Sequence, residues 1–253
     1  MNATLVLFAA VLPAAVLLYF IYKKDFLRPE PKWEMVKAFF YGMASALVSL
    51  VFAFALYLFG LYDDEAVQLW DHVRVAFFGA AIPEEGAKLL MLWLFVRKCK
   101  HFDEWVDGIV YAVCVGMGFA AFENIEYLFT SLDEWLDVGT SRALTAVPAH
   151  FFFAVAMGYF LSKGWFGDPK SRDINYVLAL LVPVLFHGVY DACLMVSDIA
   201  GISAAAVLLF IGLYIFMAVR SRKFYLAHHK RDLQEQEKPK IPSIDEDDLT
   251  GLS

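Results

Sequence analysis

Charged residues and cysteines are scarce in this chain of 253 residues, and each shortage narrows its class. Charged side chains make up 19% of the sequence, whereas soluble domains carry about 25%. Three scattered cysteines are too few for a disulfide framework or a cysteine-based metal site. The net charge of −7 leaves no basic footprint, so we expect no nucleic acid partner.

Apolar residues fill the chain instead. They make up 60% of it, against about 45–50% in soluble domains, and the mean hydropathy is +0.56. Fifteen glycines and nine prolines are too few for a low-complexity chain. The composition excludes a disordered protein and argues against a soluble globular fold. A lipid bilayer is therefore the expected environment.

Seven apolar runs are long enough to cross a bilayer as helices, which takes about 20 residues each. They are too long for membrane strands and do not alternate as strands do. The runs are Thr4–Tyr22, Val36–Phe59, Val73–Val96, Val106–Phe129, Ala143–Leu161, Tyr176–Val196 and Ile202–Val219. This pattern predicts an all-α, polytopic membrane protein with about seven transmembrane helices.

The positions of Lys and Arg predict the orientation of these helices. Eighteen of the 21 lie in the connections after the first, third and fifth runs and in the tail after the seventh. Because cytoplasmic loops collect positive charge, the N-terminus is expected outside and the C-terminus in the cytoplasm. We expect residues 1–225 to form the membrane domain. Residues 226–253 are expected to form a polar, disordered cytoplasmic tail.

Four of the seven runs carry polar residues at a similar depth, in the outer half of the membrane. Counted along ideal helices, the carboxylates and imidazoles lie roughly 9–18 Å from the external face. Ionisable groups inside a bilayer are costly and mark function by default. The set comprises Glu84, Glu85, Lys88, Glu123, Asn124, Tyr127, His150, His187 and Asp191.

Plainer explanations exist for single members of this set. Glu84 and Lys88 are four residues apart on one helical face, and a simpler interpretation is a buried salt bridge that helps to hold the helices together. His187 and Asp191 share the same spacing, which suits either a structural pair or an imidazole oriented for chemistry. Glu126 lies near the membrane surface, where a solvated or structural role is the simpler interpretation. The coincidence of depth is what favours function for the set.

The chemistry that fits is hydrolysis by an activated water. No Ser or Cys nucleophile occurs in these segments, whereas a carboxylate can act as general base beside a His or Lys that stabilises negative charge. The same side chains can bind zinc, although the His-Glu-x-x-His signature is absent. Both routes remain open. A rival hypothesis is a proton-coupled transporter, because buried Glu, His and Asp also relay protons. A scaffold whose tail recruits partners would leave the cluster unexplained.

At these residues the sequence resembles the PrsW family of bacterial intramembrane proteases. The matching motifs are Glu84-Glu85-x-x-Lys88, Phe122-Glu123-Asn124-x-x-Tyr127, His150 and His187-x-x-x-Asp191. They cover about half of the chain, in matching order. The wider CAAX-protease and bacteriocin-processing superfamily is similar, but Lys88 lies one residue closer than its Arg, and no His follows Phe122 at the matching offset. The mechanism of that superfamily is therefore not carried over.

The resemblance implies a protease of the bacterial plasma membrane that makes the first, extracytoplasmic cut in a single-span, anti-sigma-factor-like protein. Glu84 or Glu85 would act as general base on a water. Glu123, His150 and His187 would hold a metal such as zinc, or shape the oxyanion site. The remaining four residues would support and orient these groups: Lys88, Asn124, Tyr127 and Asp191.

Overall fold

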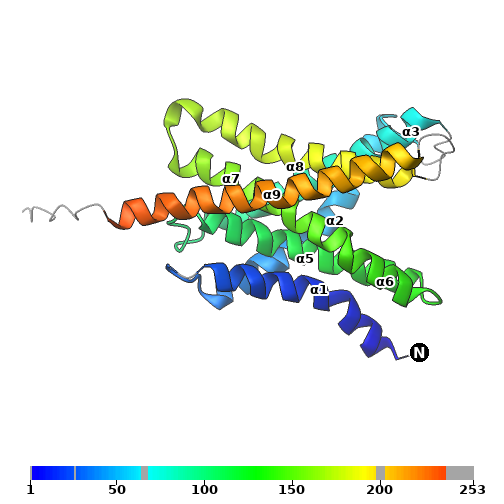
Figure 1. Ribbon diagram of the computed structural model, residues 1–253, viewed down its shortest axis with the longest axis horizontal. Coiled ribbons are helices and arrows are strands. Elements are labelled where there is room, and N and C mark those ends of the chain that lie inside the picture. The colour runs from blue at the N-terminus through cyan, green and yellow to red at the C-terminus, as the bar shows by residue number, and fades with distance from the viewer. Residues whose placement is uncertain (1, 26, 64–67, 198–202, 238–253) are drawn as a thin grey trace, which may run out of the picture.

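The computed structural model describes residues 2–25, 27–63, 68–197 and 203–237, and within them every regular element is a helix (Figure 1). The predicted all-α fold is confirmed. The elements are α1 (Ala3–Lys24), α2 (Lys32–Leu58), α3 (Leu69–Arg74), the π-helical η1 (Val75–Ala81), α4 (Ile82–Val96), α5 (Asp107–Thr130), α6 (Trp135–Leu144), α7 (Ala146–Phe166), the 3₁₀ turn η2 (Pro169–Ser171), α8 (Arg172–Met195) and α9 (Ser203–Gln236).

Six helical stretches of the described chain are long and apolar enough to span a membrane. The predicted span 73–96 lies within a helix that runs without a gap from Leu69 to Val96. Its middle part, Val75–Ala81, is π-helical, so the span is assigned as the successive elements α3, η1 and α4. Pro83 follows that segment and has no N–H to donate, and an inserted π-turn accommodates such a gap in the hydrogen-bond ladder. The polytopic membrane architecture predicted from the apolar runs is therefore confirmed.

Helix α5 is the centre of the bundle. In the most apolar stretch of α5, 83% of the residues are buried, whereas in the most apolar stretch of the peripheral α9 only 11% are buried. Glycines bring its neighbours to backbone contact: a Cβ on Gly118 would lie 2.0 Å from the carbonyl oxygen of Phe39 in α2. A Cβ on Gly42 would lie equally close to the carbonyl oxygen of Val115. Small residues at such crossings are typical of helix packing in membranes.

The two ends of the bundle differ in what they carry. One end, here called the outer end, holds the N-terminus, α3 and α6 (Figure 1). The opposite, inner end holds the connections rich in Lys and Arg. The distribution of positive charge predicts that the inner end is the cytoplasmic side.

Helix α9 departs from the sequence-based expectation, because it continues to Gln236. The first part of segment 226–253 is therefore helical, where a disordered tail was expected. The reason is a set of tertiary contacts: the Asp232 carboxylate accepts hydrogen bonds from the backbone N–H groups of Trp105 and Val106, at 2.8 and 3.0 Å. Residues 238–253 lie outside the described part of the chain.

Candidate active site

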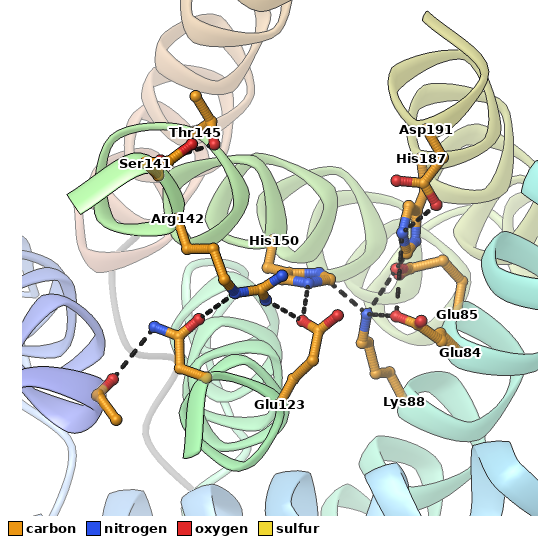
Figure 2. A network of polar contacts seen from close by, with 12 residues as sticks. Glu84, Glu85, Lys88, Glu123, Ser141, Arg142, Thr145, His150, His187 and Asp191 are labelled. Atoms are coloured by element: carbon orange, nitrogen blue, oxygen red, sulfur yellow. Dashed lines mark hydrogen bonds and ion pairs between the residues drawn. The ribbon is translucent and has the colours of Figure 1, made fainter. Parts of the chain in front are cut away.

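Four helices bring the predicted polar residues to one place near the outer end (Figure 2). The first turns of α4 supply Glu84, Glu85 and Lys88, and the outer half of α5 supplies Glu123. His150 comes from α7, and His187 and Asp191 come from α8. The residues that the sequence places at a similar membrane depth are thus close together in the structure.

Lys88 lies at the middle of the cluster. Its ammonium Nζ is 2.8 Å from Glu85 Oε1, 3.3 Å from Glu84 Oε2 and 3.1 Å from His150 Nδ1. An ammonium has three N–H donors, and three acceptors surround this one. The Glu84–Lys88 pair is therefore part of a network that joins α4 to α7 and is more than a bridge within one helix.

His150 continues the network toward α5. Its Nε2 lies 2.9 Å from Glu123 Oε2. Because Nδ1 faces the Lys88 donor, it acts as an acceptor, and Nε2 carries the proton that is donated to Glu123. The contact fixes one tautomer of the imidazole and aligns it between a cation and a carboxylate.

His187 has carboxylates at both ring nitrogens. Nδ1 is 2.9 Å from Glu85 Oε1, and Nε2 is 3.2 Å from Asp191 Oδ2. The ring also stacks on Phe153, with 4.8 Å between centroids. The pair of residues four apart in α8 is therefore built into the cluster, with Asp191 orienting the imidazole from behind.

Arg142 is a member of the cluster that the sequence analysis did not identify. Its Nη2 donates to Glu123 Oε2 at 2.7 Å, and its Nε donates to Asn124 Oδ1 at 2.7 Å. The guanidinium also lies over the ring of Tyr127, 3.9 Å from its centroid. It comes from the short α6 in the connection between α5 and α7. The available signal was that Arg142 is one of only two cations in the predicted external loops, the other being Arg74.

Only part of the cluster meets open space. A cavity of about 350 Å³ lies between α2 and α5, and both Glu84 and Glu123 line it. Their side chains are 16% and 18% exposed, whereas that of Glu85 is fully buried and that of Lys88 is 3% exposed. A molecule in this cavity would therefore meet the Glu84 and Glu123 carboxylates first, with the other groups behind them.

The residues present suit a metal ion in their chemistry. One atom each of Glu84, Glu85, His150 and His187 lies within 4.8 Å of the other three, and imidazole with carboxylate is a donor set that zinc takes. Glu85 Oε2 is buried without a hydrogen-bond partner. This group keeps both histidines of the expected ligand set but has Glu84 and Glu85 in place of Glu123, which lies beyond His150. Lys88 Nζ approaches three of the same residues, so its ammonium and a metal would compete for them.

Sequence comparisons find one matching protein family and several similar proteins. A family described as PrsW family intramembrane metalloprotease matches residues 30–219. Protease PrsW of Clostridioides difficile (strain 630) is 33% identical over 226 residues, covering 88% of this chain and 92% of that protein. Protease PrsW of Bacillus subtilis (strain 168) is 35% identical over 183 residues, covering 72% and 79% respectively. No solved structure matches.

Proposed function

The chain belongs to the PrsW family of intramembrane metalloproteases and is a multi-pass bacterial membrane peptidase, and from this premise we propose how its cluster hydrolyses a substrate. The observation that carries the proposal is the placement of Glu84 and Glu123 on the wall of the cavity between α2 and α5. A peptide bond and a water could meet both carboxylates there. Membership of a protease family also favours hydrolysis over the proton-coupled transport that the same residue types would suit.

Glu84 is the proposed general base. Its carboxylate is open to the cavity, while Glu85 is fully buried between Lys88 and His187 and cannot reach a water in the cavity. A carboxylate within hydrogen-bond reach of a water can take its proton as the oxygen attacks the carbonyl carbon. Glu85 would instead hold Lys88 and His187 in place.

The negative oxygen that forms on the attacked carbonyl needs positive charge nearby. Lys88 and Arg142 supply it from opposite sides of His150 and Glu123. Fixed positive charges of this kind stabilise the developing charge more than mobile water does. In the second half of the reaction, the proton taken by Glu84 would pass to the leaving amine.

Zinc is the proposed metal, held by residues drawn from Glu84, Glu85, His150 and His187. When bound, it would polarise the carbonyl and lower the pKa of the attacking water. The cluster holds two permanent cations, Lys88 and Arg142, and four carboxylates: Glu84, Glu85, Glu123 and Asp191. A divalent cation would offset the surplus negative charge in this buried setting.

The proposed substrate is a single-span membrane protein of the anti-sigma-factor kind, cut near its extracytoplasmic side. The cluster lies toward the outer end of the bundle, because Glu84 and Glu85 are in the first turn of α4, which follows directly from α3 and η1. Such a cut would fall in the outer half of the membrane. A substrate anchored in the same bilayer would reach that depth by lateral movement.

The test is cleavage of a co-expressed single-span protein by the wild type and by Glu84→Ala, Glu85→Ala and His187→Ala variants. We expect each substitution to abolish the cut product, and undiminished cleavage by all three would refute the mechanism. Metal analysis of the purified protein, with activity before and after chelation, tests zinc separately. Full activity in a metal-free sample would remove zinc from the proposal and leave Glu84 as the base.

A further inference from the structure

The cavity between α2 and α5 has a shape that the helix crossing dictates. The two backbones touch where Gly42 meets Val115 and Gly118 meets Phe39. Straight helices that touch at one level diverge beyond it, and the cavity begins one turn outward from this crossing, at Ala46. The glycines thus close the inner end of a cleft that opens toward the outer end.

One face of each helix lines the cleft. On α5 the lining residues follow a helical spacing along a single face: Phe119, Phe122, Glu123, Glu126, Tyr127 and Thr130. On α2 the lining residues are Ala46, Ser49 and Leu50, and the Ser49 hydroxyl is bonded to its own helix at the Ala46 carbonyl oxygen. Two small residues and Leu50 therefore form one wall, and a mixture of aromatic and polar residues forms the other.

The length of the lining face and the chemistry of cleavage both suit an extended chain. From Phe119 to Thr130 the lining face runs about 16 Å at 1.5 Å per residue. An extended peptide of about five residues covers that length. A scissile peptide bond in such a segment would lie open to the Glu84 and Glu123 carboxylates, whereas within a helix its N–H and C=O would be engaged in the helix's own hydrogen bonds.

The outer end of the cleft carries a carboxylate that nothing in the described chain engages. Glu126 is exposed, and among the described residues no hydrogen bond or ion pair is made by its side chain, although Glu123, one turn inward, is held by Arg142 and His150. A carboxylate at the edge of a narrow cleft attracts a cationic side chain and repels an acidic one. The three carboxylates that line the cleft, those of Glu84, Glu123 and Glu126, strengthen this bias.

We propose that the cleft between α2 and α5 binds the substrate as an extended segment of about five residues, and that Glu126 selects a Lys or Arg on the outer side of the cut. The proposal rests on the proposed protease function of the cluster. Glu126 lies three residues outward from Glu123, about 4.5 Å along the helix, so the selected cation falls one or two residues outside the scissile bond. Glu126 is thus a specificity residue in addition to the catalytic cluster.

The experiment uses the full-length protein in membranes with a library of single-span reporters, randomised over ten residues at the extracytoplasmic boundary. We expect reporters cut by the wild type to be enriched at least about threefold in Lys or Arg one or two residues outside the cut. Glu126→Gln should abolish the enrichment, and Glu126→Lys should reverse it toward Asp and Glu. The control Glu134→Lys places the same charge change in the neighbouring exposed loop and should keep the wild-type preference.

The outcomes separate the two levels of the proposal. If the wild type cuts reporters but Glu126→Lys keeps the preference for cations, the assignment of the cleft fails while the protease function stands. If the wild type cuts no reporter, the proposed function fails and the cleft assignment falls with it. A reversal that Glu134→Lys reproduces would show a general surface-charge effect and would also overturn the assignment.

A second pair of variants tests the cleft by size. Ser49→Trp would add bulk to the wall that α2 forms and should lower cleavage at least about tenfold. Leu47→Trp adds the same bulk on the exposed, lipid-facing side of α2 and should leave cleavage unchanged. Thermal unfolding of both variants in detergent checks folding, and equal cleavage by two folded variants would refute the assignment.

Discussion

Buried carboxylates gather at both ends of the bundle, but different partners hold them. At the outer end, Glu85 and Glu123 are held by the charged side chains of Lys88 and Arg142 and by imidazoles. At the inner end, three carboxylates, those of Asp25, Asp107 and Asp232, accept backbone N–H groups. Asp107 Oδ2 accepts from Asp103 and Glu104, at 2.9 and 2.6 Å.

The inner carboxylates satisfy a structural need. The first N–H groups of a helix have no partner within it, and a carboxylate is a strong acceptor for them. Asp25 accepts from the Glu30 N–H in the connection between α1 and α2, at 2.8 Å. Asp232 accepts from Trp105 and Val106, at the start of α5. These groups hold loops and helix starts, and none of them lines the two cavities found near this end, whose charged lining residues are Lys32 in one and Lys24 and Arg222 in the other.

The comparison yields a criterion for buried charge. A carboxylate that accepts hydrogen bonds from backbone amides stabilises one conformation, and its oxygens are then not available to a substrate. A carboxylate placed among ammonium, guanidinium and imidazole groups, with a cleft beside it, can exchange protons and meet a substrate. Three predictions test this division, from the largest expected effect to the smallest.

The largest effect is expected from Arg142, which pairs with Glu123. Arg142→Met should lower the cleavage rate at least about tenfold, or 1.4 kcal/mol in the barrier, because Glu123 loses its cation and shifts against His150. The measurement is the rate at saturating substrate, with thermal unfolding as a check on folding. The rate of Arg142→Lys should be higher than that of Arg142→Met, because Lys keeps the positive charge. It should stay below the wild-type rate, because an ammonium cannot contact Glu123 and Asn124 at once as the guanidinium does. Equal rates for Met and Lys would assign Arg142 to packing alone.

The second effect concerns stability at the inner end. Asp232→Ala removes the acceptor for two backbone N–H groups and should cost about 1–2 kcal/mol of unfolding free energy, which lowers the Tm by roughly 2–8 °C. The folded fraction should cleave substrate at the wild-type rate. Gln234→Ala, on the exposed side of the same helix, is the matched control. A loss of activity in Asp232→Ala without a loss of stability would break the division between the two ends.

Much of this arrangement follows from the sequence, and the exceptions have physical causes. The apolar runs predict the helices because a bilayer requires about 20 apolar residues per span. Their similar depth in the membrane predicts that the side chains of four residues lie close together: Glu84, Glu123, His150 and His187. Helical periodicity says nothing about distances between helices, however, so the grouping of both histidines with Glu84 and Glu85 could not be derived from spacing.

Arg142 and Asp232 share a different cause. Both lie in segments whose composition reads as loop or tail, and only tertiary contacts give them a place. Arg142 comes from a ten-residue helix between two spans, and Asp232 from a polar extension of α9. Composition reports what a segment can bury by itself. The composition of a segment does not indicate which buried N–H group or carboxylate, elsewhere in the chain, the segment will bind.

The smallest effect is a pH dependence of stability that originates at the inner end. Burial raises the pKa of Glu30 from 4.5 to about 7, and burial likewise raises the pKa of Asp25 from 3.8 to about 6. Between the unfolded and folded pKa values, the folded protein keeps a proton that the unfolded chain releases. Stability should therefore be fully present below about pH 4 and fall as the pH rises toward 8.

Glu30→Gln should flatten this decline, because the amide does not titrate and its oxygen can still accept the hydrogen bond that Tyr111 donates to Glu30. We expect the wild type to lose on the order of 1 kcal/mol between pH 5 and pH 8, or about 2–4 °C in Tm, and the variant to lose less. The measurement is thermal unfolding in detergent across that range. Asp133→Asn, in the exposed outer loop, should keep the wild-type slope. A wild-type stability that rises with pH would contradict the assignment, because it would mean that the inner carboxyl groups ionise more readily in the folded protein than in the unfolded chain.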